Sequence, residues 1–194
     1  MEKEAVTLLK NLLMQQNRKT VTLDALQEVC RRMDYAPFHD AITSLQQDGV
    51  LAPIKAGGCD HGGLEIKNAI IEYLKQKGIE YTDCGTYTAE SVDYPVYAKK
   101  VCAEITSGRC TAGILCCGTG IGMSIAANKI RGIRAAVLSD EFSAEMTRRH
   151  NNANVLCLGG RVIDSAKAVK LADIFLNAPF EGGRHEKRVA MLED

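Results

Sequence analysis

Apolar residues follow two different rhythms along residues 54–194. Short continuous runs such as Ala112–Cys117 are typical of strands buried on both faces of a parallel sheet. Longer segments instead repeat apolar residues on one side, as Leu64, Ile70 and Leu74 do, which predicts amphipathic helices. Strands are expected at 54–59, 79–83, 112–117, 133–138 and 155–158, and helices at 62–77, 94–105, 122–130, 141–149, 165–176 and from about 184 onward. This alternation predicts a Rossmann-like, three-layer αβα domain with a five-stranded parallel sheet.

Residues 1–52 show a helical pattern alone. Leu9 and Leu13 share one side of the first expected helix, Thr22 precedes the second as an N-cap, and the third runs from Pro37 to Gly49. We therefore expect two domains: a small all-α extension at 1–52, similar to the core of a winged helix, and an α/β domain at 53–194.

The charge balance argues against a polyanionic partner. The 194 residues include 24 Lys and Arg against 24 Asp and Glu, and residues 1–52 hold six against seven. A nucleic-acid reader usually presents a basic face. No apolar run reaches the length of a membrane span, and the first 13 residues lack the basic start and cleavage site of a signal peptide. We expect a cytoplasmic protein that binds neither membrane nor nucleic acid.

The eight cysteines favour reduced thiols over a disulfide framework or a metal site. Several lie inside apolar runs, and no Cys-x-x-Cys pair occurs. The four histidines are scattered along the chain, whereas zinc sites need clustered ligands. The sequence therefore predicts neither a metal nor another cofactor.

Residues that carry chemistry follow the predicted strands, and ligands bind at the carboxyl ends of strands in open parallel sheets. Asp60 and His61 follow the first strand, Cys117 closes the third, and Arg161 follows the last. The structural alternative for Asp60 is a capping acid beside an incidental histidine. Because these residues gather at one expected edge, that edge is the candidate site.

The loop Gly118–Gly122 has glycines at alternate positions between a buried strand and a helix start. Such a loop lets backbone N–H groups approach an anion closely. One interpretation is a dinucleotide fingerprint, which fits poorly because Met123 stands at the third glycine position and the loop follows the third strand. The other is an oxyanion hole for a small substrate, formed by Gly118, Gly120, Ile121 and Gly122.

Cys117 directly precedes this loop, and the amino end of a helix stabilises a nearby thiolate. The plain alternative is a buried, inert thiol. Cys116 is expected to face the opposite side of the sheet, because side chains alternate along a strand.

Further candidates lie toward the carboxyl terminus. His150 and Asn151 end the helix before the last strand, and we expect them at the same edge as Cys117. Arg184 and Arg188 stand one helical turn apart, which suits a phosphate group. The alternatives are a charge complement to the helix dipole at His150 and a solvated basic patch at the arginines.

Residues 54–194 resemble the type B ribose-5-phosphate isomerases and their relatives, which include the galactose-6-phosphate isomerase subunits. The resemblance rests on a set of motifs that is specific only in combination: Cys59-Asp60-His61-Gly62-Gly63, Glu90-Ser91-Val92-Asp93-Tyr94-Pro95, the stretch 113–129, Arg149-His150-Asn151-Asn152-Ala153-Asn154-Val155 and Glu181-Gly182-Gly183-Arg184-His185. The extension 1–52 lies outside the family pattern, and Lys55, Gly57 and Gly58 make the first strand less apolar than the family usually shows.

The resemblance implies an aldose-ketose isomerase that interconverts D-ribose 5-phosphate and D-ribulose 5-phosphate through an enediolate, without a cofactor. It implies a homodimer with active sites shared between subunits, or a tetramer built from such dimers. Cys117 would move the proton, Asp60 and Thr119 would serve the substrate oxygens, and His150 would open the sugar ring. The phosphate would be held by His61, Arg161, Arg184 and Arg188, some of them from the partner, while Tyr94 and Asn151 would line the site.

Two alternatives remain open from the sequence. A six-carbon substrate such as allose or galactose 6-phosphate would need few visible changes. A sugar-phosphate-responsive DNA regulator would use the winged-helix-like extension, although its charge argues against this. Cys117, His150 and Arg184 on one chain favour a self-sufficient pentose-phosphate enzyme.

Overall fold

The computed structural model describes residues 55–193, and the expected helices of 1–52 lie outside the described residues. Five parallel strands form one sheet in the order β2-β1-β3-β5-β4. They span Lys55–Cys59 (β1), Tyr81–Asp83 (β2), Ala112–Cys117 (β3), Ala135–Val137 (β4) and Val155–Gly159 (β5). From β1 the chain adds β2 on one side and then crosses to add β3 on the other, so the strand order reverses between β1 and β3. Strand β3 lies at the centre of the sheet between β1 and β5.

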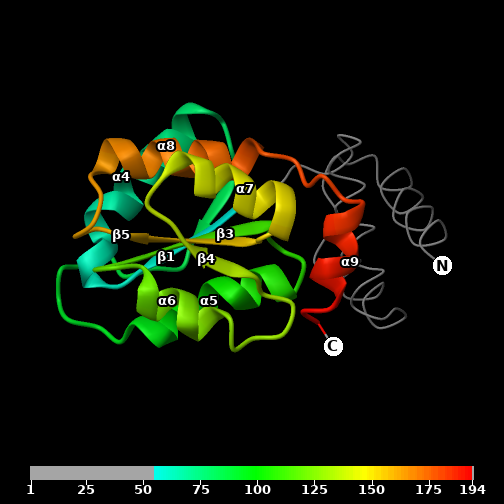
Figure 1. Ribbon diagram of the computed structural model, residues 1–194. Helices are drawn as coiled ribbons and strands as arrows, with labels where there is room; N and C mark the ends of the chain where they lie inside the picture. The colour runs from blue at the N-terminus through cyan, green and yellow to red at the C-terminus, as the bar shows by residue number, and fades with distance from the viewer. Residues whose placement is uncertain (1–54, 194) are drawn as a thin grey trace, which may run out of the picture. The chain divides into compact units, whose positions relative to one another are not determined.

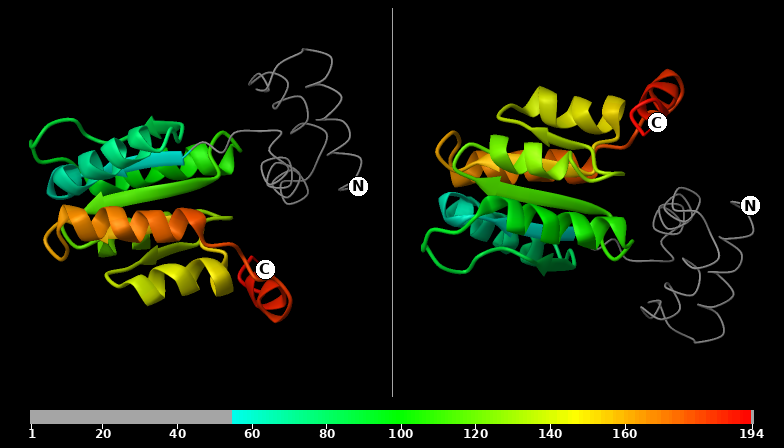
Figure 2. Two further views of the ribbon diagram at one scale, coloured as in Figure 1. Left: turned by 90° about the horizontal axis from the view of Figure 1, so that it is seen from above. Right: turned by 90° about the horizontal axis from the view of Figure 1, so that it is seen from below.

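Helices cover both faces of the sheet (Figures 1 and 2). One face carries α4 (Leu64–Gln76), α7 (Glu141–Asn151) and α8 (Ser165–Asn177), and the other carries α5 (Tyr94–Thr106) and α6 (Ile121–Ala127). A short 3₁₀ turn, His61–Gly63, leads from β1 into α4, and α9 (Arg184–Ala190) packs against α7. The predicted three-layer αβα fold with a five-stranded parallel sheet is therefore confirmed.

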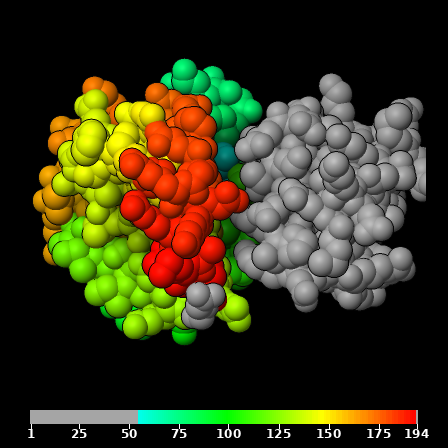
Figure 3. Space-filling model, turned by 45° about the vertical axis from the view of Figure 1, so that its right-hand side comes forward, coloured from blue at the N-terminus to red at the C-terminus, as the bar shows by residue number. Residues whose placement is uncertain are grey.

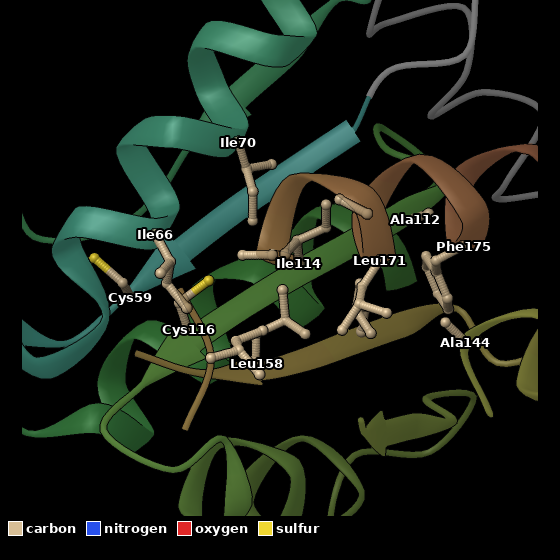
Figure 4. Close-up of a cluster of buried hydrophobic side chains, with 14 of the residues drawn as sticks. Cys59, Ile66, Ile70, Ala112, Ile114, Cys116, Ala144, Leu158, Leu171 and Phe175 are labelled. Carbon is tan, nitrogen blue, oxygen red and sulfur yellow. The ribbon is translucent and has the colours of Figure 1, made fainter. Parts of the chain in front are cut away.

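Two buried clusters of apolar side chains fill the space between the layers. The first joins β3 and β5 to α4, α7 and α8, with Ile66, Leu158 and Phe175 among its members (Figure 4). The second lies on the other face, where Val101 of α5 and Met123 of α6 pack against the sheet. All six residues of β3 are buried, as expected for a strand covered on both faces.

Two glycines explain why the weakly apolar β1 still forms a strand. An ideal Cβ on Gly58 would lie 2.6 Å from a Val101 methyl group, and one on Gly113 of β3 would lie 2.7 Å from the other. The absent side chains therefore allow α5 to pack directly onto the backbones of β1 and β3. Lys55, at the start of β1, donates from Nζ to Thr111 Oγ1 at 2.9 Å.

The observed bounds agree with most of the predicted ones, and β3 matches at both ends. Helix α6 ends at Ala127, three residues before its predicted end at 130. The amide side chain of Asn128 accounts for this, because it donates to Ala135 O and accepts from Ala135 N, each at 2.8 Å. Across residues 55–193, no helix combines the length and the apolar character that a bilayer crossing requires.

Candidate active site at the carboxyl edge of the sheet

Three loops meet at the carboxyl edge of the sheet, after β1, β3 and β5, and glycines bring their backbones into contact. A Cβ built on Gly63 would lie 2.3 Å from the Cys116 carbonyl carbon, and one on Gly159 would lie 2.7 Å from the Thr119 carbonyl carbon. A Cβ on Gly160 would lie 2.5 Å from Gly62 O. No larger residue fits these positions without moving a backbone, so the loops form a closely packed platform.

Cys117 is the last residue of β3 and its side chain lies in the platform. Its Sγ accepts a hydrogen bond from the Gly120 N–H at 3.0 Å, and 5% of the residue is exposed. Gly120 has a φ of 79°, a conformation that glycine adopts at little cost. The tight turn of the loop therefore aims a backbone donor at the sulfur.

Cys116 faces the opposite side, as predicted. It belongs to the cluster around α4 and α8, where Figure 4 shows it near Ile66, whereas Cys117 belongs to the cluster under α5 and α6. Complete burial raises the pKa of the Cys116 thiol well above its ordinary value. Burial likewise raises the pKa of Cys59 and of Cys102 to about 11, which keeps these thiols protonated near neutral pH.

Asp60 lies beside Cys117 across the β1–β3 pair. Its backbone N donates to Cys116 O at 3.1 Å, and its Oδ1 accepts from the Gly62 N–H at 2.8 Å. An ideal Cβ on Gly62 would lie 3.0 Å from Gly118 N and 3.4 Å from Asp60 Oδ1, so carboxylate and glycine loop are neighbours. The residue thus caps a 3₁₀ turn, as the structural alternative held, and also presents its carboxylate to the candidate site.

The next three residues surround this centre. The His61 Nδ1 accepts from the Val92 N–H at 3.4 Å, so Nε2 is the ring nitrogen available as a donor. The Arg161 side chain lies over Gly118, where an ideal Cβ would be 3.4 Å from its Nε, and its backbone N donates to Gly118 O. The Tyr94 ring lies over Gly122 at 2.9 Å from such an ideal Cβ.

Thr119 and Ile121 complete the loop and are exposed. The Thr119 Oγ1 accepts from the Ile121 N–H at 3.4 Å. The structure thus brings together Asp60, His61, Tyr94, Cys117, Thr119, Arg161 and the loop Gly118–Gly122. It leaves out four predicted residues: His150, Asn151, Arg184 and Arg188.

These four lie at the opposite, amino edge of the sheet, so the expectation that His150 and Asn151 share an edge with Cys117 is wrong within a single chain. All strands are parallel, and α7 ends at Asn151 just before β5 begins at Val155. Its last turn therefore lies where β5 starts, whereas Cys117 pairs with Gly159 at the end of β5. Arg184 and Arg188 belong to α9, which packs against α7 and lies beyond that end of the sheet (Figure 1).

The amino-edge group also contains Glu181 and His185, two side chains to which the sequence assigned no role. The His150 and His185 rings are stacked with centroids 4.2 Å apart and planes 1° from parallel. A Glu181 carboxylate oxygen lies 3.7 Å from the Nε2 of each ring. Both residues stand in the motif 181–185, but only the docking of α9 against α7 shows that they meet.

A nearly buried cysteine beside a carboxylate, on a glycine-built loop at the switch point of a parallel sheet, defines the site of an α/β enzyme acting on a small molecule. A family model described as ribose/galactose isomerase matches residues 56–192. The chain belongs to this family.

Similar proteins and structures carry ribose-5-phosphate isomerase names. Ribose-5-phosphate isomerase B of Escherichia coli is 48% identical over 137 residues, which cover 71% of this chain and 92% of that protein. The crystal structure of a ribose 5-phosphate isomerase from Thermotoga maritima superposes with a TM-score of 0.71 at 51% identity, covering 73% of this chain and 97% of the other. That of ribose-5-phosphate isomerase B from Mycoplasma genitalium, with bound ribulose-5-phosphate, gives 0.69 at 40% identity, with 72% and 93% covered.

Proposed function

We propose that this chain interconverts D-ribose 5-phosphate and D-ribulose 5-phosphate. Relatives with ribose-5-phosphate isomerase names are identical at about half of the aligned residues and are covered over more than nine tenths of their own length. The observation that carries the proposal is the Cys117 sulfur, held by the Gly120 N–H beside the Asp60 carboxylate.

The reaction moves one proton between neighbouring carbons. A base removes the proton alpha to the carbonyl, an enediolate forms, and the proton returns to the other carbon, so atoms and electrons balance without a cofactor. Cys117 is placed for this transfer, while Asp60 and Thr119 move protons between the two substrate oxygens. The loop Gly118–Gly122 stabilises the oxyanion by backbone hydrogen bonds.

Ring opening and phosphate binding use the amino-edge residues. A cyclic aldose must open before its alpha proton becomes acidic, and His150 is the proposed acid–base group for that step. His61 and Arg161 at one edge, with Arg184 and Arg188 at the other, supply the positive charge and hydrogen-bond donors for the phosphate. Asn151 and Tyr94 line the sugar.

Because the two groups lie at opposite edges of one sheet, a second copy of the chain must join them. We propose a homodimer in which the carboxyl edge of one subunit faces the amino edge of its partner, giving two shared sites. A tetramer made from two such dimers would preserve this arrangement.

The alternatives from the sequence separate by substrate and by ligand. A six-carbon preference predicts faster turnover of allose or galactose 6-phosphate than of ribose 5-phosphate, and an assay across these sugars decides between them. The DNA-regulator alternative depends on residues 1–52, outside the described residues, and predicts salt-dependent binding to duplex DNA.

A cytoplasmic location is part of the same proposal. In the described part of the chain, seven cysteines are free thiols, Cys84 among them, and four of these lie within strands of the sheet. Reduced thiols are the usual state in the cytoplasm.

The test compares neighbouring cysteines that face opposite sides of the sheet. Cys117→Ala should lower kcat by about 10²–10⁴-fold, the usual contribution of a general base. It should change KM little, because the thiol is proposed to act on a proton and not to bind the phosphate. Cys116→Ala is the matched control and should keep kcat, since that thiol lies in the apolar cluster on the other face. Near-normal kcat in Cys117→Ala would refute the assignment.

A further inference from the structure

The stacked pair at the amino edge has a geometry that a solvated surface histidine does not need. His185 is buried, with 6% of its surface exposed, although it lies on the exposed helix α9 (Figure 3). His150 lies in the last turn of α7, and its ring is parallel to that of His185. The docking of α9 therefore restricts the orientation of the His150 ring.

Hydrogen bonds and ion pairs of Arg149, Glu181 and Arg184 hold the two rings in this arrangement. The Arg149 Nε donates to Glu181 Oε1 at 2.6 Å, and the backbone N of Glu181 donates to Arg149 O at 3.0 Å. The Glu181 carboxylate thus stays beside both imidazoles. The Arg184 Nε donates to the His185 Nε2 at 3.3 Å, so this nitrogen acts as an acceptor.

An acceptor Nε2 places the ring proton of His185 on Nδ1 and makes the ring neutral. Burial is the main reason that the pKa of His185 is lowered from its ordinary value, and the neighbouring His150 and Arg184 add to the effect. Glu181 acts in the opposite direction, and Arg188 in the same one. His185 is therefore a neutral ring beside His150. Under the proposed function, His150 is the member of the pair that exchanges a proton with the sugar.

The same three side chains have the composition of a metal site, but not its geometry. A metal ion bound to an imidazole lies in the plane of the ring, along the nitrogen lone pair, about 2.0–2.1 Å away for zinc. Two rings that are parallel within 1° and stacked face to face share no such point. The arrangement instead suits the positioning of one ring by another.

We propose that His185 is a positioning residue for ring opening: its stacked, neutral ring holds His150 in the orientation in which it exchanges a proton with the cyclic sugar. This inference rests on the proposed function. In ring opening, the C1–O4 bond breaks, a proton is delivered to O4, and the C1 hydroxyl loses its proton to become the aldehyde. No proton is gained or lost overall, and the His150 ring must reach a sugar oxygen to take part.

Substrate chemistry provides a readout that separates this role from general damage. Ribose 5-phosphate is mostly a closed furanose, formed by O4 on C1. In ribulose 5-phosphate the O5 that would close a five-membered ring on C2 carries the phosphate, so this sugar is acyclic. Exchange of the C1 proton of ribulose 5-phosphate with solvent through the enediolate therefore involves no ring step, whereas isomerisation of ribose 5-phosphate requires ring opening.

The experiment compares isomerisation of ribose 5-phosphate with proton exchange in ribulose 5-phosphate, both with the full chain. His185→Ala should lower kcat/KM for ribose 5-phosphate by about 10²-fold, the usual effect of a misplaced catalytic group. The rate of deuterium incorporation from D₂O at C1 of ribulose 5-phosphate should fall by less than about threefold, because this exchange passes through the enediolate without a ring step. The exchange also reports that the variant is folded. His185→Phe, which keeps a flat ring for stacking, should recover at least about tenfold of the loss.

A double variant tests whether His185 acts through His150. Adding His185→Ala to His150→Ala should change the forward rate by less than about threefold, because the residue to be positioned is already absent. Equal losses in isomerisation and in deuterium exchange, or no loss of isomerisation in His185→Ala, would overturn the inference while leaving the proposed function intact. A wild-type chain inert with both sugars would overturn the proposed function and this inference together.

Discussion

At the scale of single residues, glycine decides the geometry of the carboxyl edge. Gly120 has a positive φ, and an ideal Cβ there would lie 2.8 Å from a Val137 methyl group and 3.0 Å from the Leu158 carbonyl carbon. Its N–H is also the donor to the Cys117 sulfur. Gly120 thus combines an unusual backbone conformation, close packing and the hydrogen bond to the thiol proposed as the base.

Gly78 is a natural control, because it has a φ of 65° with nothing within 4 Å of an ideal Cβ. Gly78→Ala should cost only the conformational penalty, about 1–2 kcal/mol in unfolding free energy. Gly120→Ala should cost more and should also lower kcat, because the clash displaces the N–H from the sulfur. Urea denaturation and initial rates measure both effects. Equal stability losses in the two variants would contradict the packing argument.

Single residues also show what the sequence could not provide. The alternation of side chains along a strand separated Cys117 from Cys116, since that rule is local. The meeting of His150, Glu181 and His185 is not local, because it depends on how α9 docks against α7. The sequence therefore identified the thiol proposed as the base but assigned no role to His185.

At the scale of elements, β1 is a strand with an unfavourable residue at its start. Lys55 is largely removed from water, and burial lowers its pKa from 10.5 to about 8, with Arg148 adding to the effect. The folded state thus disfavours the charged form. Between pH 8 and 10.5 the unfolded chain binds a proton that the folded chain has released, so this residue makes stability rise with pH across that window.

Lys55→Met should therefore raise the unfolding free energy at pH 7 by on the order of 2–3 kcal/mol. The gain should shrink as pH rises above 8 and should vanish only above pH 10.5, where wild-type Lys55 becomes neutral in the unfolded state as well. Thermal or urea unfolding across pH 6–11 measures the difference. Lys99→Met, on the exposed side of α5, should give a difference that is small and flat with pH. A pH-independent gain in Lys55→Met would disprove the charge argument.

The element bounds were predictable where periodicity alone determines them and less so where side chains reach across the sequence. The continuous apolar run Ala112–Cys117 fits only a buried strand, and both ends of β3 were predicted. The early end of α6 depends on Asn128 pairing with Ala135, seven residues away. Such a contact leaves no periodic signal.

At the scale of the whole molecule, the candidate residues divide between two edges of one sheet. His150 was expected at the same edge as Cys117 but lies at the other, because it ends a helix and helices here run opposite to the strands. The topology itself contained this information. Under the proposed function, one chain with Cys117 at one edge and His150 at the other carries two incomplete halves of a site.

Mixing of variants tests whether two chains complete each other. Cys117→Ala and His150→Ala should each be deficient alone in the conversion of ribose 5-phosphate. After co-refolding in equal amounts, half of the dimers are mixed and one of their two sites is intact, so about a quarter of wild-type activity should return. Two Cys117→Ala preparations mixed together are the control. Activity no higher than the average of the two variants would contradict the shared site.

The contact of α5 with the sheet has a consequence for remote tuning of the enzyme. Val101 rests on the bare backbones at Gly58 and Gly113, and the same helix begins at Tyr94, whose ring covers Gly122. Seven residues of helix separate the two contacts, roughly 10 Å along the axis. Helix α5 therefore connects a close contact in the core with a residue at the candidate site. Under the proposed function, the methyl group that Gly113→Ala adds against Val101 would displace α5 and raise KM, without altering any residue proposed to bind the substrate.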